Sequence, residues 1–286
     1  MKNFIYILIA ILFAGCSHVP VYVLKNPPTQ EVAPEGYVKV ASHEFTFESD
    51  RPPTDSVNTC AVWGVNHIHR CNGGMYNPDG TLVPADDPRN YCEWNPNQVL
   101  WNEWGGVSLI TDLNPGEGKT PIVSGFIATT TNYTPPVYVA ARIKVTPGGG
   151  TYWTSLVSYS PNGWQPENDI AEFECSDSKA FTVSLHRLQP DGSDAMVATK
   201  KFRFPFDLSE KFHLYSADIQ VDRIVIYMDN VKIWEYAEPG LNNEPIYFSV
   251  GNGIYQNADP DFISPEDKKK MFPMAAHVDY LRIYQP

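Results

Sequence analysis

The stretch WQPENDIAEFEC, residues 164–175, gathers four carboxylates into eight residues of what otherwise has the pattern of a buried β-strand. In a regular strand Glu167 and Asp169 project from one face, because side chains alternate, and Glu172 projects from the other. A single bulge between Asp169 and Glu172 returns Glu172, and Glu174 after it, to the first face. We therefore expect a bulged strand with a row of acids on one face. The apolar positions of this strand pack on the opposite face, at Ile170 and Phe173.

Acids at this density are unusual in a strand, because neighbouring carboxylates repel each other and the segment from Glu167 to Glu174 holds no basic residue. Glycoside hydrolysis uses closely set carboxyl groups, one as nucleophile and one, with a raised pKa, as acid and then base. The alternatives are a calcium site, which takes several carboxylate oxygens, and a solvated strand face. Aromatic side chains that can stack on sugar rings lie nearby, at Trp153, Tyr159 and Trp164.

Short strands dominate the rest of the sequence. The 286 residues are 13% aromatic and include 25 prolines and 19 glycines, which is typical of many short strands joined by turns and long loops. Strand patterns are predicted for residues 38–41, 43–48, 124–131, 137–145, 152–160, 168–174, 181–188, 212–221, 223–236, 245–251 and 277–285. Asp229 and Asn230 have the turn chemistry of a hairpin. The sequence therefore predicts an all-β fold, a two-sheet antiparallel sandwich.

The segment ENDIAE, residues 167–172, resembles the Glu-x-Asp-x-x-Glu signature of glycoside hydrolase family 16, which contains laminarinases, lichenase relatives, agarases, porphyranases and carrageenases. Its context is similar too: residues 124–145 resemble the two strands before the catalytic one, 212–235 the paired strands after it, and 277–285 the final strand. These blocks keep the family order over more than half of the chain, whereas residues 45–123 match poorly. The resemblance implies a concanavalin A-like β-jelly roll with a sugar-binding cleft on its concave face.

Carried over to this sequence, the resemblance implies that Glu167 is the nucleophile and Glu172 the acid/base. Asp169, between them, would tune their proton affinities and orient the nucleophile. Trp153 and Trp164 would line the cleft and stack on sugar rings. Hydrolysis would proceed with retention of configuration, a mechanism that needs the two carboxyl groups about 5–5.5 Å apart.

One position departs from the family pattern. The residue after the first Glu is usually aliphatic, and here it is Asn168. A buried Asn needs hydrogen-bond partners for its amide. Either the local core is polar, or the strand begins later and the functional pair is Glu172 and Glu174.

The resemblance also bears on metal binding. An Asp in the final strand of family members often helps to bind a structural calcium, and Asp279 matches that position. Its oxygen chemistry suits calcium. The hydrolytic reaction itself is expected to require no cofactor.

The N-terminus resembles a bacterial lipoprotein signal. Lys2 precedes an apolar run, residues 4–13, that is too short to span a bilayer comfortably, and Ala14, Gly15 and the lipidated Cys16 follow. A plain secretory signal is the alternative. The expected organisation is a signal peptide, a flexible tether and a catalytic domain, over residues 1–16, 17–36 and 37–286. The protein is therefore expected in the bacterial cell envelope, anchored by lipid, or secreted.

Export places the other cysteines in an oxidising compartment, where disulfides form. Four cysteines allow three full pairings, among which the sequence does not choose: Cys60, Cys71, Cys92 and Cys175. Three of them fall in a loop-rich insertion, predicted at residues 58–118, that a disulfide would stabilise. A zinc site is the alternative, since His67 and His69 lie nearby, although the spacings match no standard zinc pattern.

The formal net charge of −12 argues against nucleic acid and against an anionic membrane surface, because both need a concentrated basic face. The expected partner is a polysaccharide, with the membrane reached only through the lipid, and the expected state is a monomer. Two function classes remain: an endo-acting β-glycanase, and a non-catalytic, lectin-like surface lipoprotein on the same sandwich. Retention of all three acids in order favours the enzyme.

Substrate specificity is the least constrained prediction. An acidic protein suits a densely sulfated galactan poorly, so a neutral β-glucan is the first expectation and an agar-type or other galactan the second. Arginines in the cleft would reverse this preference; the candidates are Arg70, Arg89 and Arg187. The tryptophans of the insertion are either sugar platforms or loop cores: Trp63, Trp94, Trp101 and Trp104.

Overall fold

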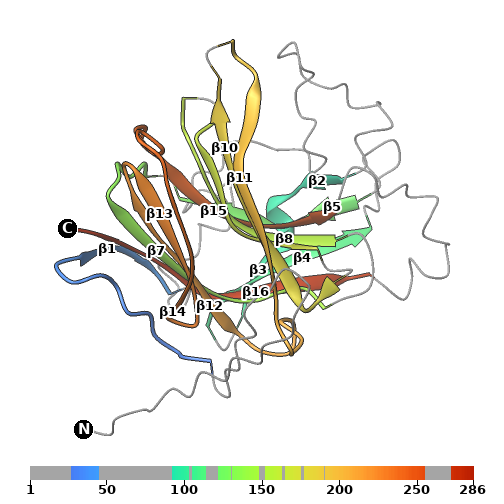
Figure 1. The fold of residues 1–286 in the computed structure, drawn as a ribbon. Helices are drawn as coiled ribbons and strands as arrows, with labels where there is room; N and C mark the ends of the chain where they lie inside the picture. The colour runs from blue at the N-terminus through green and yellow to red at the C-terminus, as the bar shows by residue number, and fades with distance from the viewer. Residues whose placement is uncertain are drawn as a thin grey trace, which may run out of the picture.

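Two packed β-sheets make up the described part of the protein in the computed structural model (Figure 1). The structure describes residues 27–44, 92–102, 105–113, 122–129, 131–147, 152–162, 165–174, 177–189, 191–254 and 272–286. Within these ranges nearly every element is a strand; the helical pieces are the 3-10 turn η3 (Pro96–Gln98) and a single 3-10 residue at Asp177. No helix in the described ranges is long and apolar enough to cross a membrane. The predicted all-β sandwich is confirmed.

The larger sheet contains ten strands of the described chain. Along its main path lie β14 (Val231–Ala237), β13 (Arg223–Met228), β12 (His213–Gln220), β7 (Val137–Lys144), β16 (Met274–Gln285), β4 (Val107–Leu113), β5 (Ile122–Ser124) and β2 (Cys92–Trp94). Two more strands pair off this path, β1 (Val38–His43) with β16 and β3 (Val99–Trp101) with β4. All of its pairings are antiparallel except that of β2 with β5.

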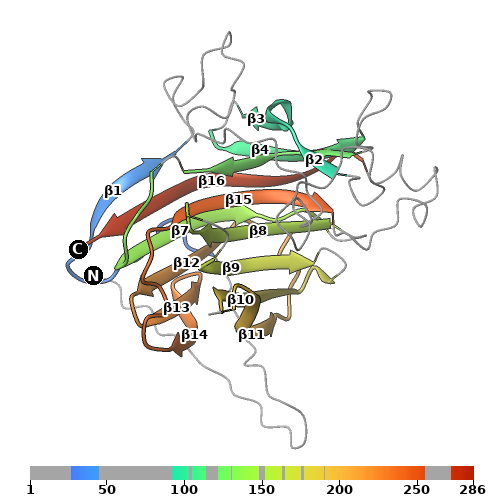
Figure 2. The ribbon, with the colours of Figure 1, turned by 90° about the horizontal axis from the view of Figure 1, so that it is seen from above.

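The smaller sheet contains six strands, which Figure 2 shows in a layer of their own. Their order is β11 (Asp194–Arg203), β10 (Ala180–Leu188), β9 (Glu167–Glu174), β8 (Tyr152–Tyr159), β15 (Tyr247–Ile254) and β6 (Phe126–Ala128). The acidic stretch of the sequence is therefore β9, an inner strand of this sheet. A strand paired on both sides holds its side chains more rigidly than an edge strand does.

The hydrophobic core fills the space between the two sheets. Every second residue of β7 in the larger sheet and the apolar residues of β9 in the smaller sheet are almost fully buried there: Val139, Ala141, Ile143, Ile170 and Phe173. The ring of Phe173 meets Tyr215 of β12 edge-on, with centroids 5.0 Å apart. Since a fully buried Val, Ile or Phe side chain contributes roughly 1.5–3 kcal/mol, this packing fixes β9 from beneath.

The hairpin between β13 and β14 confirms the predicted turn. Met228 pairs with Val231, so the loop consists of Asp229 and Asn230 alone. Both residues have positive φ, 50° and 64°, as a type I′ turn requires. Asp229 also accepts a hydrogen bond from the Leu214 amide at 2.8 Å, which ties the turn to β12.

The structure corrects the expected loop-rich insertion at residues 58–118. Strands β2, β3 and β4 lie in its second half, and β4 pairs with both β16 and β5. Val107 and Leu109 of β4 have no exposed surface. These strands are short and separated by polar turns, so few of their residues repeat with period two. The sequence pattern also missed β11, an edge strand of the smaller sheet, because most of its residues are exposed and many are lysine or other polar residues.

The structure also corrects the expected tether at residues 17–36. Its last part, from residue 27, follows the outer face of the larger sheet (Figure 1). The Val32 amide donates to Asn230 Oδ1 and Asn230 Nδ2 donates to the Gln30 carbonyl, both at 2.9 Å. Ala33 and Tyr37 pack on a second apolar cluster on this outer face. The proline and polar residues of this segment predicted a flexible linker, but residues 27–36 cover the outer face of the larger sheet.

Glu31 is the polar anchor of this segment. Its side chain is 4% exposed, and its Oε2 lies 2.8 Å from Arg282 Nη1. Tyr284 also donates its hydroxyl hydrogen to Glu31. The carboxylate thus joins the N-terminal segment to β16, the strand at the centre of the larger sheet.

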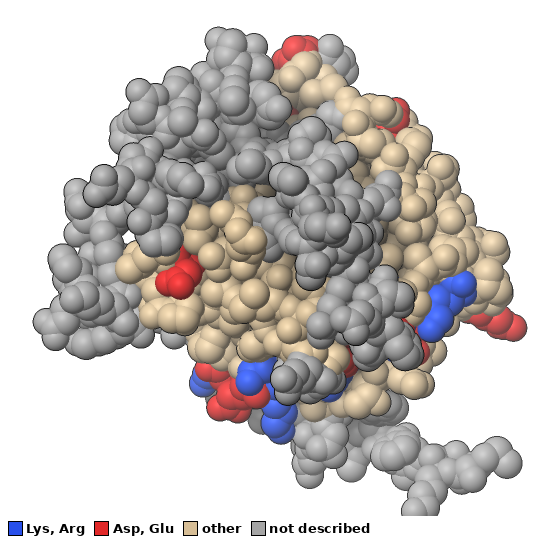
Figure 3. Space-filling model, turned by 180° about the vertical axis from the view of Figure 1, so that it is seen from behind, with Lys and Arg blue, Asp and Glu red and all other residues tan. Residues whose placement is uncertain are grey.

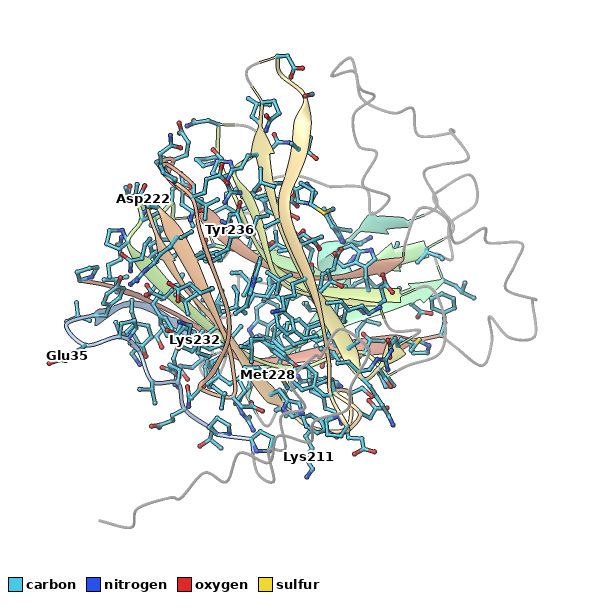
Figure 4. The ribbon with its side chains drawn as sticks, in the orientation of Figure 1. Glu35, Lys211, Asp222, Met228, Lys232 and Tyr236 are labelled. Atoms are coloured by element: carbon cyan, nitrogen blue, oxygen red, sulfur yellow. The ribbon has the colours of Figure 1, made fainter. Side chains whose placement is uncertain are left out.

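Replacement of Glu31 by Ala is expected to lower the free energy of unfolding by about 1–3 kcal/mol, because it leaves partly buried donors of Arg282 and Tyr284 without their acceptor. Thermal unfolding of the domain measures the loss. Glu35→Ala is the matched control: Glu35 lies in the same segment but is exposed and points away from the sheets (Figure 4). Equal melting temperatures for the two variants would show that the segment contributes no stability.

Candidate active site

The predicted bulge is present in β9. The register between β8 and β9 shifts by one residue between Asp169 and Ala171, so Ile170 is the extra residue. Its side chain is buried in the core. As a result Glu167, Asp169 and Glu172 lie together on the outward side of the smaller sheet, here called the acidic face, and Glu174 follows on the same face at the exposed end of the strand.

The acidic face surrounds these residues with small and polar side chains. On β10 each acid faces one residue, with His186 opposite Glu167, Ser184 opposite Asp169 and Thr182 opposite Glu172. Glu167 and Asp169 are each only 7% exposed, whereas Glu172 is half-buried. The three carboxyl groups thus differ in solvation, and the first two lie in the drier part of the face.

Asp169 favours its protonated form. Burial raises the pKa of Asp169 well above its ordinary value of 3.8, and the negative charges of Glu167 and Glu172 raise it further. A hydrogen bond in which the protonated Asp169 is the donor and Glu167 the acceptor raises the pKa of Asp169 as well. The hydrogen bond between these two groups therefore holds a proton on Asp169.

His186 is a functional candidate that sequence reasoning missed. Its Nε2 lies 3.7 Å from Asp169 Oδ2, and its Nδ1 lies 3.0 Å from Asp194 Oδ2. Gln165 donates to the same Asp194 carboxylate at 2.8 Å. The imidazole is thus held between two carboxyl groups, one of them in the acidic cluster. Period two places His186 on one face of β10, but only the pairing of β10 with β9 brings that face to the acids.

Asn168 shows that the local core is polar. It has no exposed surface, it donates from Nδ2 to Ser158 Oγ at 2.9 Å, and its Oδ1 accepts from Arg187 Nη2 at 2.8 Å. Strand β9 begins at Glu167, so the alternative of a later start is wrong. The Glu174 side chain is 50% exposed and lies 3.4 Å from Lys201 Nζ, in the setting of an ordinary surface ion pair.

Aromatic side chains border the acids on β8 and β15. Tyr159 packs against Tyr247, with ring centroids 5.6 Å apart. Burial raises the pKa of Tyr159 well above its usual value, and the negative charge of Glu167 adds to the shift. The phenol therefore remains a neutral donor beside the carboxylates. Of the other two predicted aromatics, Trp153 lies on this face at the far end of β8, and Trp164 lies outside the described residues.

Trp153 belongs to an aromatic cluster supported by glycine. Trp94 stacks on Phe126 with centroids 4.2 Å apart and meets Trp153 edge-on at 6.3 Å. A Cβ at Gly253 would lie 2.7 Å from Trp153 Cζ2, so only glycine leaves room for the indole there. Trp101, by contrast, packs on the main core. Trp63 and Trp104 lie outside the described residues.

The family profile of Glycosyl hydrolases family 16 matches residues 86–249, which is more than half of the chain. The chain belongs to this family. It is accordingly a glycoside hydrolase. No match was found among the curated proteins.

Solved structures show that this family 16 chain shares its fold with β-glycanases. A laminarinase catalytic domain from Thermotoga maritima gives a TM-score of 0.63 at 17% identity over 88% of this chain and 99% of that one. A laminarinase from a Flavobacterium species gives 0.63 at 20% identity, over 87% and 100%. The β-agarase B of Zobellia galactanivorans gives 0.56 at 18% identity, over 68% and 79%.

The calcium expected for the family does not fit Asp279 in this chain. Asp279 Oδ2 lies 2.6 Å from Arg142 Nη1, so a guanidinium already compensates the carboxylate. The described residues contain no group of three side chains suited to a metal ion. The alternative zinc site and the disulfides rest on side chains that the structure does not describe: Cys60, His67, His69, Cys71, Cys92 and Cys175.

Gly253→Ala is expected to raise KM about 3–10-fold with little change in kcat, because the new methyl group pushes Trp153 off its platform and weakens ring stacking. Steady-state kinetics on a polymeric substrate of the wild type measures the effect, and tryptophan fluorescence reports the displaced indole. Ser249→Ala, on the same face of the same strand, adds no atom near Trp153 and serves as control. An unchanged KM in the glycine variant would remove Trp153 from substrate binding.

Proposed function

We propose that this family 16 enzyme is an endo-acting β-glycanase that hydrolyses a β-linked polysaccharide with retention of configuration. The observation that carries the proposal is the bulge at Ile170, which brings Glu167, Asp169 and Glu172 to one face of one strand. A retaining mechanism needs two carboxyl groups that converge on the same sugar. The acidic face supplies them from neighbouring positions of a buried strand.

In the first step the ionised Glu167 attacks the anomeric carbon and the glycosidic C–O bond breaks. Glu172, half-buried and protonated at that moment, gives its proton to the leaving oxygen. In the second step Glu172 takes a proton from water, whose oxygen then displaces Glu167 from the glycosyl-enzyme. Asp169 donates a hydrogen bond to the ionised Glu167, whose negative charge is neutralised as its oxygen bonds to the anomeric carbon. The chemistry uses carboxyl groups alone and needs no cofactor.

A neutral β-glucan is the first proposed substrate, with an agar-type or other galactan second. Cations on the described part of the acidic face are compensated: Lys201 lies near Glu174 and Asp177, at 3.4 and 3.7 Å. Arg187 points between the sheets instead of onto this face. Arg70 and Arg89 lie outside the described residues. The similar folds of laminarinases and of an agarase are consistent with both substrates.

The described residues on the face shown in Figure 3 give no support to other macromolecular partners. On the face shown in Figure 3 the few Lys and Arg side chains of the described residues lie next to Asp and Glu. A nucleic acid or an anionic bilayer needs the opposite, a broad basic field. The polysaccharide is therefore the proposed partner, and the proposed state is a monomer.

The proposed location is the bacterial cell envelope, with a lipid on Cys16. Residues 29–37 lie on the outer face of the larger sheet, which is the side of the sandwich away from the acidic face. An anchor leading to this segment leaves the acidic face free for a polymer. Mass spectrometry of the N-terminal peptide from membranes tests the lipid separately from the activity.

Reducing-sugar release by residues 17–286 against laminarin, mixed-linkage glucan, agarose, porphyran and carrageenans tests the activity. Release of a ladder of oligosaccharides from one polymer is the expected result, and proton NMR of the first product gives its anomeric configuration. Binding to one polymer without hydrolysis of any would replace the proposal by a lectin-like role. An inverted product would remove Glu167 as nucleophile.

A further inference from the structure

Arg187 lies directly beneath the residue proposed as nucleophile. It occupies the side of β10 that faces the larger sheet, next to His186 on the acidic side. Its Nη1 donates to the backbone carbonyl of Glu167 at 2.9 Å, and its Nη2 donates to Asn168 Oδ1 at 2.8 Å. Burial lowers the pKa of Arg187 to about 10, so the guanidinium remains charged at neutral pH.

The guanidinium also connects the two sheets. Its Nη2 donates to Asn242 Oδ1 at 3.0 Å, and Asn242 Nδ2 in turn donates to the Gln220 carbonyl at the end of β12, at 2.9 Å. On the other side Asn168 donates to Ser158 of β8. Asn168, Ser158 and Asn242 have no exposed surface. A largely buried set of hydrogen bonds thus runs from the larger sheet through the partly buried Arg187 to the first two residues of β9.

We propose that Arg187 is a positioning residue for Glu167, holding the backbone and the neighbouring side chain of the nucleophile in place from beneath the sheet. This rests on the proposed function, in which Glu167 attacks the substrate. The need for such support follows from the bulge. At a bulge the regular ladder of hydrogen bonds is interrupted, and here the interruption comes three residues after Glu167, at Ile170.

The directed hydrogen bonds of Arg187 show that it positions Glu167 and Asn168 and does more than fill space between the sheets. An aliphatic residue in place of Asn168 would fill space but would direct no hydrogen bond, whereas the planar guanidinium fixes the Glu167 carbonyl and the Asn168 amide together. The Glu167 side chain starts from that same backbone. A displacement of about 1 Å at a reacting group can cost about 10²-fold in rate.

Arg187→Met tests the proposal, with Arg203→Met as the matched control, because Arg203 is an exposed arginine on the adjacent β11. The expected result for Arg187→Met is a kcat lower by about 10²-fold with KM within about twofold of wild type. Hydrogen exchange in the peptide over residues 165–174 should become faster while peptides of β7 and β12 keep their rates. Arg203→Met should leave all three quantities unchanged.

A second variant and the same exchange measurement keep the proposal testable. Asn242→Ala removes one partner of the guanidinium and leaves every acid in place, so it should give a smaller loss in kcat of the same kind. Uniformly faster exchange, or a kcat that falls only with the folded fraction, would overturn the proposal. If the wild type hydrolyses no polymer, the proposed function fails, and the exchange pattern in residues 165–174 still decides whether Arg187 holds this strand.

Discussion

Glu167→Gln is expected to abolish polysaccharide hydrolysis, lowering kcat by about four orders of magnitude or more, as loss of a catalytic nucleophile does. The amide has nearly the shape of the carboxylate but does not form the glycosyl-enzyme. Glu172→Gln removes the acid/base and is expected to cost about 10²–10⁴-fold. Reducing-sugar release over long incubations, with folding checked by thermal unfolding, measures both variants.

Glu174→Gln is the control for this pair, because it makes the same chemical change on the same strand. The Glu174 side chain is 50% exposed and lies near Lys201. Its replacement should leave kcat close to that of the wild type. A variant as inactive as Glu167→Gln would instead support the Glu172–Glu174 pair that the departure at Asn168 suggested.

Azide separates the two proposed roles. In Glu172→Ala the glycosyl-enzyme still forms on a substrate with a good leaving group, and azide can attack it without a general base. Added azide should therefore restore turnover and give a glycosyl azide of retained configuration. In Glu167→Ala the covalent intermediate does not form, so the same product from that variant would exchange the assigned roles.

The parts of the fold that follow from local pattern were predictable. Strand β7 alternates between residues such as Val139 inside and Arg142 outside, and the turn at Asp229 and Asn230 needs positive φ that these residues tolerate. The bulge in β9 followed from the acids themselves, because only an extra residue puts Glu172 on the side of Asp169. In each case a few neighbouring residues carry the whole signal.

The parts that depend on distant pairing were not predictable. His186 reaches the acidic cluster only because β10 lies beside β9 in one register, and Arg187 reaches Asn168 by the same pairing. The docked segment around Glu31 contacts β16, about 250 positions away in the sequence. Such contacts join residues whose local sequence resembles an ordinary strand or linker, so pattern alone assigns them no partner.

Asp169→Asn is expected to make the protein more stable and less active at neutral pH. Burial and the charges of Glu167 and Glu172 raise the folded-state pKa of Asp169 above its unfolded value, near 3.8. Below that pH both states hold the proton and no difference arises. As the pH rises from there toward the folded-state pKa, the unfolded chain ionises and is stabilised while the folded protein is not, so stability falls. An Asn at this position removes that loss.

The melting temperature of Asp169→Asn should therefore match that of the wild type near pH 4 and exceed it by about 2–4 °C at pH 7, the shift that about 1 kcal/mol gives in a domain of this size. Activity should fall by about 10²-fold, because an amide donates a hydrogen bond to Glu167 but carries no exchangeable charge through the reaction. Asp191→Asn is the control: hydrogen bonds from Ser193 lower the pKa of Asp191, so its replacement brings no gain at pH 7. A pH-independent difference for Asp169→Asn would mean that Asp169 is ionised in the folded protein, and that the proton beside the nucleophile is held elsewhere.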